Sequence, residues 1–243
     1  MKLSISENSV LMGQKAADAA EKIILDALEK QGYARLLLST GQSQFEFFEA
    51  FVRKNIPWDK LEIFHLDEYV DLPLSHPASF RKYLKERFMD RICGGTMHYI
   101  DGEGDTGKTI EAYTSAIREK PIDLGMIGIG ENGHIAFNDP PADFDTEASY
   151  HVVALDEKCR RQQVGEGWFA TVDDVPKYAI SATVPMILSC RHIISVVPHS
   201  VKADAVQKTL ETEGETPMIP ATAMKKHESW QLYLDRDSAE KLS

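Results

Sequence analysis

The residues Ala34-Arg35-Leu36-Leu37-Leu38 form a short, almost wholly apolar run, which is typical of a strand in a parallel sheet that is covered on both faces. A helical pattern precedes this run, with apolar residues recurring on one face from Val10 to Leu28 and a stop at Gly32. The polar turn Ser39-Thr40-Gly41-Gln42-Ser43 follows it. The chain repeats this order of apolar strand, polar turn and helix.

The remaining elements extend the same alternation. Further strands are expected at residues 61–65, 124–129, 152–154, 178–180, 192–197 and 230–235, and further helices at residues 45–54, 79–91, 106–120 and 200–210. The chain contains no internal repeat and no linker rich in Gly, Ser or Pro. We therefore predict an α/β fold, with residues 1–243 forming one domain around a doubly wound, Rossmann-like, mostly parallel sheet with helices on both faces.

Composition and charge exclude several classes of protein. A chain of 243 residues that is 43% hydrophobic is able to bury a sizeable core, and it reads as globular. Its formal net charge of -11 argues against nucleic acid or an anionic membrane as the main partner. No apolar run approaches the ~20 residues that a membrane span requires, and Met1–Ser6 is not the start of a long apolar leader. We therefore expect a cytoplasmic protein.

The three cysteines are Cys93, Cys159 and Cys190. They are widely spaced, with no C-x-x-C motif and no His pair at metal spacing. We expect reduced, buried thiols and no metal site.

The segment Gly128-Ile129-Gly130-Glu131-Asn132-Gly133 has the spacing of a dinucleotide-binding fingerprint. Such a site needs the glycines to end a strand and open a helix, so that amide N–H groups meet a pyrophosphate. Here His134, Asp139, Pro140 and Pro141 follow, and the prolines would stop a helix and supply no N–H donors. The loop is better suited to present His134 and Asp139.

Two turns have features of an anion site. In Ser39–Ser43, Gly41 is free to take a positive φ and the amides of Gln42 and Ser43 lie near the start of a helix, although an ordinary N-cap turn would look the same. In the second turn, Ser200 can cap a helix whose first turn contains Lys202. A cation there opposes the helix dipole, so Lys202 is either solvated or held to meet an anion.

Acid–base groups stand at two other strand ends. Asp67 and Glu68 directly follow a buried strand, so one can point into a site and the other away from it. A partly desolvated carboxylate can take a proton α to a carbonyl, and a histidine such as His134 can move protons at neutral pH. The carboxyl ends of parallel strands meet at one edge of a sheet, so we expect these groups to lie together.

The same motifs resemble a known family, the glucosamine-6-phosphate deaminases (isomerases). The resemblance covers nearly the whole chain and is carried by Leu66–Val70, His76–Phe80, Gly128–Pro140 in the form G-x-G-x-N-G-H-I-A-F-N-D-P, Val175–Ala179 and Lys202–Ala203. The related 6-phosphogluconolactonases share the scaffold and the Gly-Asp/Asn-Gly-His turn. They typically have Asp-Glu-Arg in place of Asp67-Glu68-Tyr69, and they lack the Phe137-Asn138-Asp139 continuation.

This resemblance implies a reaction and a division of roles. The family opens a cyclic amino-sugar phosphate, moves a proton between C2 and C1, and releases ammonia and fructose 6-phosphate without a cofactor. Asp67 would be the base at C2, and His134 would assist ring opening with Asp139 orienting it and Asn132 beside them. The phosphate would lie at Ser39, Thr40, Gly41, Gln42 and Ser43 with Lys202, near Gly133, and Arg160 or Arg161 falls where the family places an Arg on it.

Three positions depart from the commoner family pattern. Some members have an acid where this chain has Asn132, and many have Glu where it has Asp139. The turn Thr40-Gly41-Gln42-Ser43 lacks a second Gly and a Thr-Pro that are common there. Because Asn cannot exchange a proton at neutral pH, the ring-opening relay would depend on His134 and Asp139.

Four functions are therefore open. They are a deaminase/isomerase acting on glucosamine or galactosamine 6-phosphate, a 6-phosphogluconolactonase-type hydrolase, a non-catalytic sugar-phosphate sensor and a nicotinamide enzyme. The resemblance favours the first, with a small phosphorylated amino sugar as partner. Family members differ in oligomeric state, so a monomer and a small homo-oligomer are both open.

Overall fold

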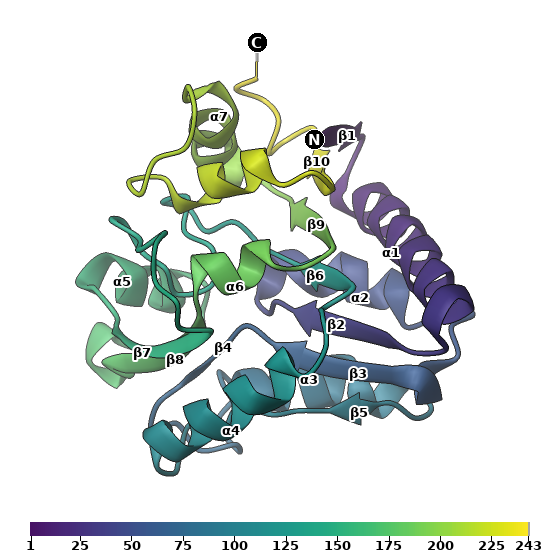
Figure 1. The fold of residues 1–243 in the computed structure, drawn as a ribbon. Coiled ribbons are helices and arrows are strands. Elements are labelled where there is room, and N and C mark those ends of the chain that lie inside the picture. Colours follow the sequence, from purple (N-terminus) through teal and green to yellow (C-terminus); the bar gives the residue numbers. More distant parts are fainter. Residues whose placement is uncertain (243) are drawn as a thin grey trace.

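A seven-stranded, all-parallel sheet forms the centre of the protein (Figure 1). The computed structural model describes residues 1–242, the side chain of Lys158 excepted. In order across the sheet, the strands are β1 (Lys2–Ser6), β10 (Trp230–Asp235), β9 (His192–Val197), β6 (Leu124–Met126), β2 (Ala34–Leu38), β3 (Leu61–His65) and β5 (Thr96–Met97). The predicted α/β class and mostly parallel sheet are confirmed.

Helices cover both faces of this sheet, as predicted. One face carries α1 (Ser9–Gln31), α2 (Phe45–Phe51) and α3 (Phe80–Arg87), and the other carries α4 (Thr106–Arg118), α6 (Val184–Leu188) and α7 (Ala203–Glu211). Successive side chains of a strand point to opposite faces. Accordingly, Leu36 and Leu38 of β2 pack with the first group of helices, whereas Leu37 packs with the second. The five residues of β2 are all buried, which explains their apolar sequence.

The long helix α1 is defined at both ends by its sequence. The Asn8 side chain accepts a hydrogen bond from the amide of Leu11 at the start, and Gly32 ends the helix in the left-handed conformation with φ 78°. Gly13 lies against α2, where a Cβ atom would stand 2.6 Å from the carbonyl carbon of Glu46. The absence of a side chain at this position lets the two helices pack closely.

A second, antiparallel sheet stands beside the carboxyl edge of the first. It consists of β4 (Asp67–Tyr69), β8 (Tyr178–Ala182) and β7 (Tyr150–Ala154). The sequence predicted β7 and β8 but not β4, because it placed Asp67 and Glu68 only after the end of the preceding strand. The amide of Leu66 bonds to Leu38 of β2, and the amide of Ala182 bonds to Leu66, so the chain passes directly from the large sheet to the small one.

Several predicted elements have different bounds. The helix expected to Lys54 ends at Phe51, the one expected over residues 79–91 ends at Arg87 with a separate short turn after it, and the strand expected to Ile129 ends at Met126. Helix α5 (Glu157–Gly165) was not predicted, because its polar sequence has little apolar periodicity. All three cysteines are free. Burial was predicted wrongly for Cys93, which is exposed in the turn before Gly94 and Gly95.

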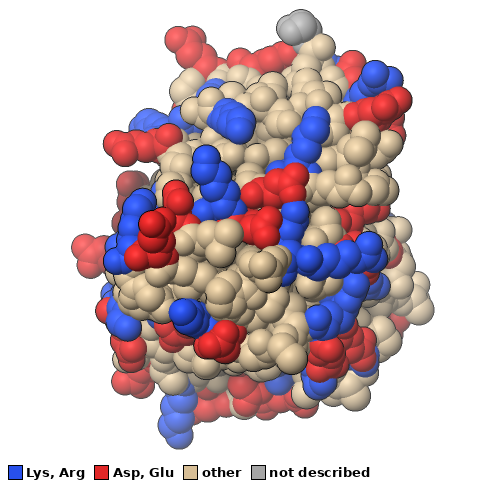
Figure 2. All heavy atoms as spheres, turned by 90° about the vertical axis from the view of Figure 1, so that its right-hand side faces the viewer, with Lys and Arg blue, Asp and Glu red and all other residues tan. Residues whose placement is uncertain are grey.

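The surface agrees with the charge argument. On the face drawn in Figure 2, Lys and Arg are interspersed with Asp and Glu, and no broad basic area occupies that face. Within residues 1–242, none of the helices is both long enough and apolar enough to span a bilayer.

Candidate active site

One cavity lies at the carboxyl edge of the large sheet, over the point where strand order reverses between β2 and β6. The amide of Ser39, just after β2, bonds to the carbonyl of Met126 at the end of β6, so the two strand ends are held side by side. The cavity encloses about 870 Å³ of empty space, part of it open to solvent. In doubly wound sheets this crevice is where ligands bind.

The turns that the sequence singled out meet in this cavity. Its lining comprises Ser39, Thr40, Gly41, Gln42 and Ser43 after β2, Leu66 and Asp67 after β3, Phe80, Gly128, Ile129, Gly130, Glu131, His134, Ala136 and Phe137 after β6, Gln162, Gln163, Glu166 and Trp168 from α5 and beyond, and His199, Val201 and Lys202 after β9.

Of the adjacent residues Asp67 and Glu68, Asp67 is the one whose carboxylate faces the cavity. It is 7% exposed, and among the described residues no donor makes a hydrogen bond to its carboxylate oxygens. Burial raises the pKa of the Asp67 carboxyl well above its ordinary value, and the neighbouring charge of Glu68 raises the pKa further. A carboxylate without donors, in a mostly buried position, is a stronger base than one in water.

Glu68 has a different surrounding. Its Oε2 accepts hydrogen bonds from the Ser79 hydroxyl at 2.9 Å and the Arg81 amide at 2.8 Å, and its Oε1 accepts from the amides of Tyr69 and Phe80. Ser79 and the two residues after it begin α3, so this carboxylate holds the start of that helix. Glu68 therefore supports the structure around Asp67 and does not face the cavity.

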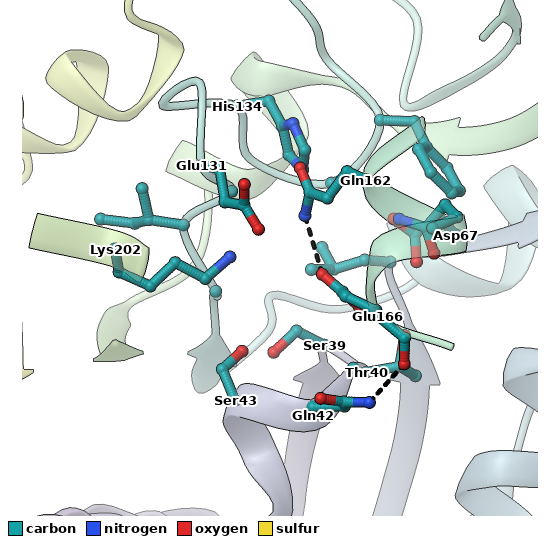
Figure 3. A pocket seen from close by; sticks show the side chains of 18 of the residues that line it. Ser39, Thr40, Gln42, Ser43, Asp67, Glu131, His134, Gln162, Glu166 and Lys202 are labelled. Atoms are coloured by element: carbon teal, nitrogen blue, oxygen red, sulfur yellow. Dashed lines mark hydrogen bonds between the residues drawn. The ribbon is translucent and has the colours of Figure 1, made fainter. Parts of the chain in front are cut away.

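His134 lines the same cavity as Asp67, and both lie away from Lys202 in Figure 3. Its Nδ1 is 3.1 Å from Oδ1 of Asp139, and the Asn132 amide donates to the same oxygen at 2.9 Å. Burial raises the pKa of Asp139, but the opposing effects of His134 and Asn132 prevail and hold that pKa below its ordinary value. Asp139 therefore stands as an ionised partner behind the imidazole.

The loop that holds His134 is shaped by its own glycines. A Cβ atom on Gly130 would stand 2.2 Å from Nε2 of His134, so only glycine lets the ring fold back over the chain. Gly133 has φ 84°, a conformation that favours glycine. Asn132 Oδ1 accepts the His134 amide at 3.0 Å. No helix follows this loop within residues 130–149, so a dinucleotide cradle is not formed there.

The turn after β2 has the features expected of an anion site. Gly41 has φ 95°, and its carbonyl accepts a hydrogen bond from the Tyr83 hydroxyl at 2.9 Å, which fixes the turn. The buried hydroxyl of Ser39 makes no hydrogen bond to any residue that the structure describes. An unpaired buried hydroxyl is costly, and a ligand oxygen would satisfy it.

Lys202 points into the same end of the cavity. Its side chain is buried, with 7% exposed, and Figure 3 shows it directed between Glu131 and Ser43. Within residues 1–242 its ammonium makes no ion pair and no hydrogen bond. Burial lowers the pKa of Lys202, while the charges of Glu166 and Glu131 partly offset this effect. Of the two alternatives left open by the sequence, solvated surface is excluded.

Five of the predicted residues do not line the cavity. Asn132 and Asp139 lie behind His134, and Gly133 packs against Ile219. Arg160 is turned toward the carbonyl of Val172 and Arg161 pairs with Glu157 on the surface, so the structure brings neither guanidinium to the turn after β2.

Sequence reasoning missed the part of the lining that comes from α5. Gln162 lies in α5 and Glu166 directly follows the helix. The two residues are four positions apart, so they lie on the same side and both reach the cavity, next to Gln163 and Trp168. The Glu166 carboxylate accepts from the Gln162 amide at 2.9 Å and from the Trp168 indole at 3.1 Å. The i, i+4 spacing of Gln162 and Glu166 was the available signal in the sequence. His199, in the turn before Lys202, was also missed.

Comparison with known proteins agrees with this geometry. Residues 7–233 match the family described as glucosamine-6-phosphate isomerases/6-phosphogluconolactonase. The chain belongs to this family.

Within the family, the chain is similar to members of both kinds. It is 30% identical to the glucosamine-6-phosphate deaminases of Streptococcus pneumoniae strain D39, over 98% of this chain and 97% of that one, and of Oenococcus oeni, over 100% and 99%. A solved structure of a monomeric glucosamine-6-phosphate deaminase is 28% identical, with a TM-score of 0.90 over 99% of both chains. The 6-phosphogluconolactonase of Trypanosoma brucei shares the fold, with 16% identity and a TM-score of 0.81 over 100% of this chain and 98% of that one.

Proposed function

We propose that this family member isomerises and deaminates an amino-sugar 6-phosphate, converting glucosamine 6-phosphate and water to fructose 6-phosphate and ammonia. The observation that carries the proposal is the position of Asp67, a carboxylate without donors among the described residues that shares a cavity with His134 and with residues Ser39–Ser43, here called the anion turn. The deaminases named among its relatives support the same choice. Galactosamine 6-phosphate, which differs in the orientation of one hydroxyl, is the alternative substrate.

Each group has a role in this reaction. His134 moves a proton between the ring oxygen and the C1 hydroxyl to open the sugar, with Asp139 supporting the charge on its imidazole. Asp67 then takes the proton from C2 of the open-chain aldehyde and returns it at C1, and water releases ammonia from the resulting imine. No step requires a cofactor. Asn132 holds Asp139 and the loop, and we assign it no proton transfer.

The anion turn supplies orientation. An open-chain sugar is mobile, and general acid–base assistance contributes only about 10² to 10⁴ in rate. Binding the far phosphate between Ser39–Ser43 and Lys202 places C2 beside Asp67, which converts the proton transfer into an intramolecular step. We propose that residues 1–243 act as one domain for this purpose and that the reaction takes place in the cytoplasm.

A panel of phosphorylated amino sugars tests the proposal. Ammonia and ketose phosphate should form together from glucosamine 6-phosphate or galactosamine 6-phosphate, and Asp67→Asn should abolish both. Unchanged turnover in that variant would reject the assignment. The family also includes 6-phosphogluconolactonases, so 6-phosphogluconolactone belongs in the panel. Faster hydrolysis of the lactone than deamination would favour that second function.

A further inference from the structure

The end of the cavity beside Ser39–Ser43 and Lys202, here called the anion end, contains more negative than positive side chains. Among the described residues, Lys202 is the only lysine or arginine in the cavity lining, whereas two glutamates, Glu131 and Glu166, line it as well. Figure 3 shows the Glu166 carboxylate across the cavity from Lys202, above the turn that contains Ser39 and Gln42. A site built only to attract a dianion would not place two carboxylates beside its lysine.

Glu166 is held in this position by hydrogen bonds. Its two carboxylate oxygens accept from Gln162 and Trp168, and its backbone carbonyl accepts from the Gln42 side chain at 2.6 Å, which ties it to the anion turn itself. A carboxylate has about four lone-pair positions and only accepts hydrogen bonds when ionised. Two positions are therefore free to accept from a ligand. Glu131 shows no comparable side-chain hydrogen bond among the described residues.

We propose that Glu166 makes the anion end selective for a phosphate that still carries one proton, because its P–OH donates to the Glu166 carboxylate, over a fully ionised group such as sulfate. This inference rests on the proposed function, since it assumes a phosphate at Ser39–Ser43 and Lys202. Phosphate esters bind their second proton with a pKa of about 6, whereas sulfate has no proton to donate near neutral pH. A fixed acceptor attracts the first ligand and repels the second.

Other charged groups face the same space and have to be separated from this effect. They are Lys202 and His199 after β9, Glu131 and His134 after β6, and Asp67 from β4. Loss of charge on Lys202 or on a histidine at high pH would weaken every anion. Sulfate keeps its charge between about pH 6 and pH 8, so its binding reports these groups alone.

The experiment is direct calorimetric binding of sulfate and of a phosphate monoester, methyl phosphate, which loses its last P–OH between about pH 6 and about pH 8, at both of these pH values. For the unmodified protein we expect phosphate to bind at least about tenfold more tightly than sulfate, with the ratio falling as pH rises. Glu166→Gln should bring the ratio close to one by strengthening sulfate. Glu131→Gln is the matched control, because it removes the same charge without the fixed acceptor, so it should strengthen both anions and keep their ratio.

The outcomes separate this inference from the proposed function. An equal affinity for phosphate and sulfate in the unmodified protein, an unchanged ratio in Glu166→Gln, the same change of ratio in Glu131→Gln, or no binding of either anion would overturn it. If deamination proceeds but the ratio is unchanged, only the inference fails. If the ratio responds as expected but no amino-sugar phosphate is turned over, the proposed reaction fails and the selectivity stands.

Discussion

Asp67 and Glu68 are adjacent in β4, but one side chain lines the cavity and the other holds the start of α3. The alternation of side chains along a strand produces this separation. It allows one carboxylate to be left without donors for chemistry while its neighbour is fully paired. Substitution of Asp67 should therefore reduce activity but not stability, whereas substitution of Glu68 should reduce stability.

Replacing Asp67 by Asn should lower kcat on the amino-sugar phosphate by about 10³ or more, because the amide cannot take the C2 proton. Binding of a substrate analogue should change little. The variant should also be at least as stable as the unmodified protein at neutral pH, because it removes a carboxylate that is disfavoured by burial. Thermal unfolding and steady-state kinetics measure both effects, and a fall in stability with full activity would contradict this role.

The pH dependence of activity should follow from the raised pKa of Asp67. The base must be ionised, so kcat/KM should fall as pH decreases through a pKa above the ordinary value for aspartate. For stability the sign is reversed. The unfolded chain ionises more easily, so the charge of Asp67 costs stability above about pH 4, the unfolded pKa, and costs nothing below it. The stability advantage of Asp67→Asn should therefore disappear in acid, and an advantage that persists there would contradict the assignment.

Replacing Glu68 by Ala should destabilise the protein by roughly 1–3 kcal/mol, since it leaves the Ser79 hydroxyl and the amides at the start of α3 without their buried acceptor, while Arg81 keeps its pairs with Asp101 and Glu103. Denaturant unfolding measures the loss. Glu86→Ala is the matched control, because Glu86 is an exposed acid of α3 whose one ion pair among the described residues is with Lys82 at the surface. Its cost should stay below about 1 kcal/mol. Similar costs for the two variants would show that the Glu68 contacts contribute little.

Replacing Gly130 by Ala should displace the His134 ring, because the added Cβ would stand 2.2 Å from its Nε2. We expect a loss in kcat on the order of 10² with the protein still folded, since a small displacement of a catalytic group is sufficient for such a loss. Gly165→Ala is the control, because a Cβ there meets nothing within 4 Å. Full activity of Gly130→Ala would mean that the position of this ring is not critical.

The large sheet and the convergence of its loops could be predicted from the sequence. The apolar run Ala34–Leu38 and the stop at Gly32 identify their elements because burial and backbone conformation restrict those residues directly. The turns at the ends of β2, β3, β6 and β9 meet in one cavity because parallel strands share one edge.

The missed features depend on tertiary contacts. β4 is three residues long and is held by pairing with β8, which lies more than a hundred residues later in the chain. Helix α5 is polar and gains its place through contacts such as the hydrogen bond from the Tyr69 hydroxyl to Gln163. Neither contact leaves a local pattern. For the same reason, the sequence led us to expect Arg160 or Arg161 at the anion turn, whereas in the structure Glu166 lies there.

The link between the two sheets also fixes the distance between Asp67 and Lys202. Asp67 belongs to the small sheet, whereas Lys202 follows a strand of the large one, and the hydrogen bonds of Leu66 to Leu38 and of Ala182 to Leu66 join the sheets rigidly. The separation between base and cation is therefore set by backbone pairing and not by a mobile loop. Under the proposed function, the distance between Asp67 and Lys202 sets how many carbons the substrate has between its acidic C2–H bond and its phosphate. A pentose phosphate, one carbon shorter, could bind its phosphate or present C2 to Asp67, but not both at once.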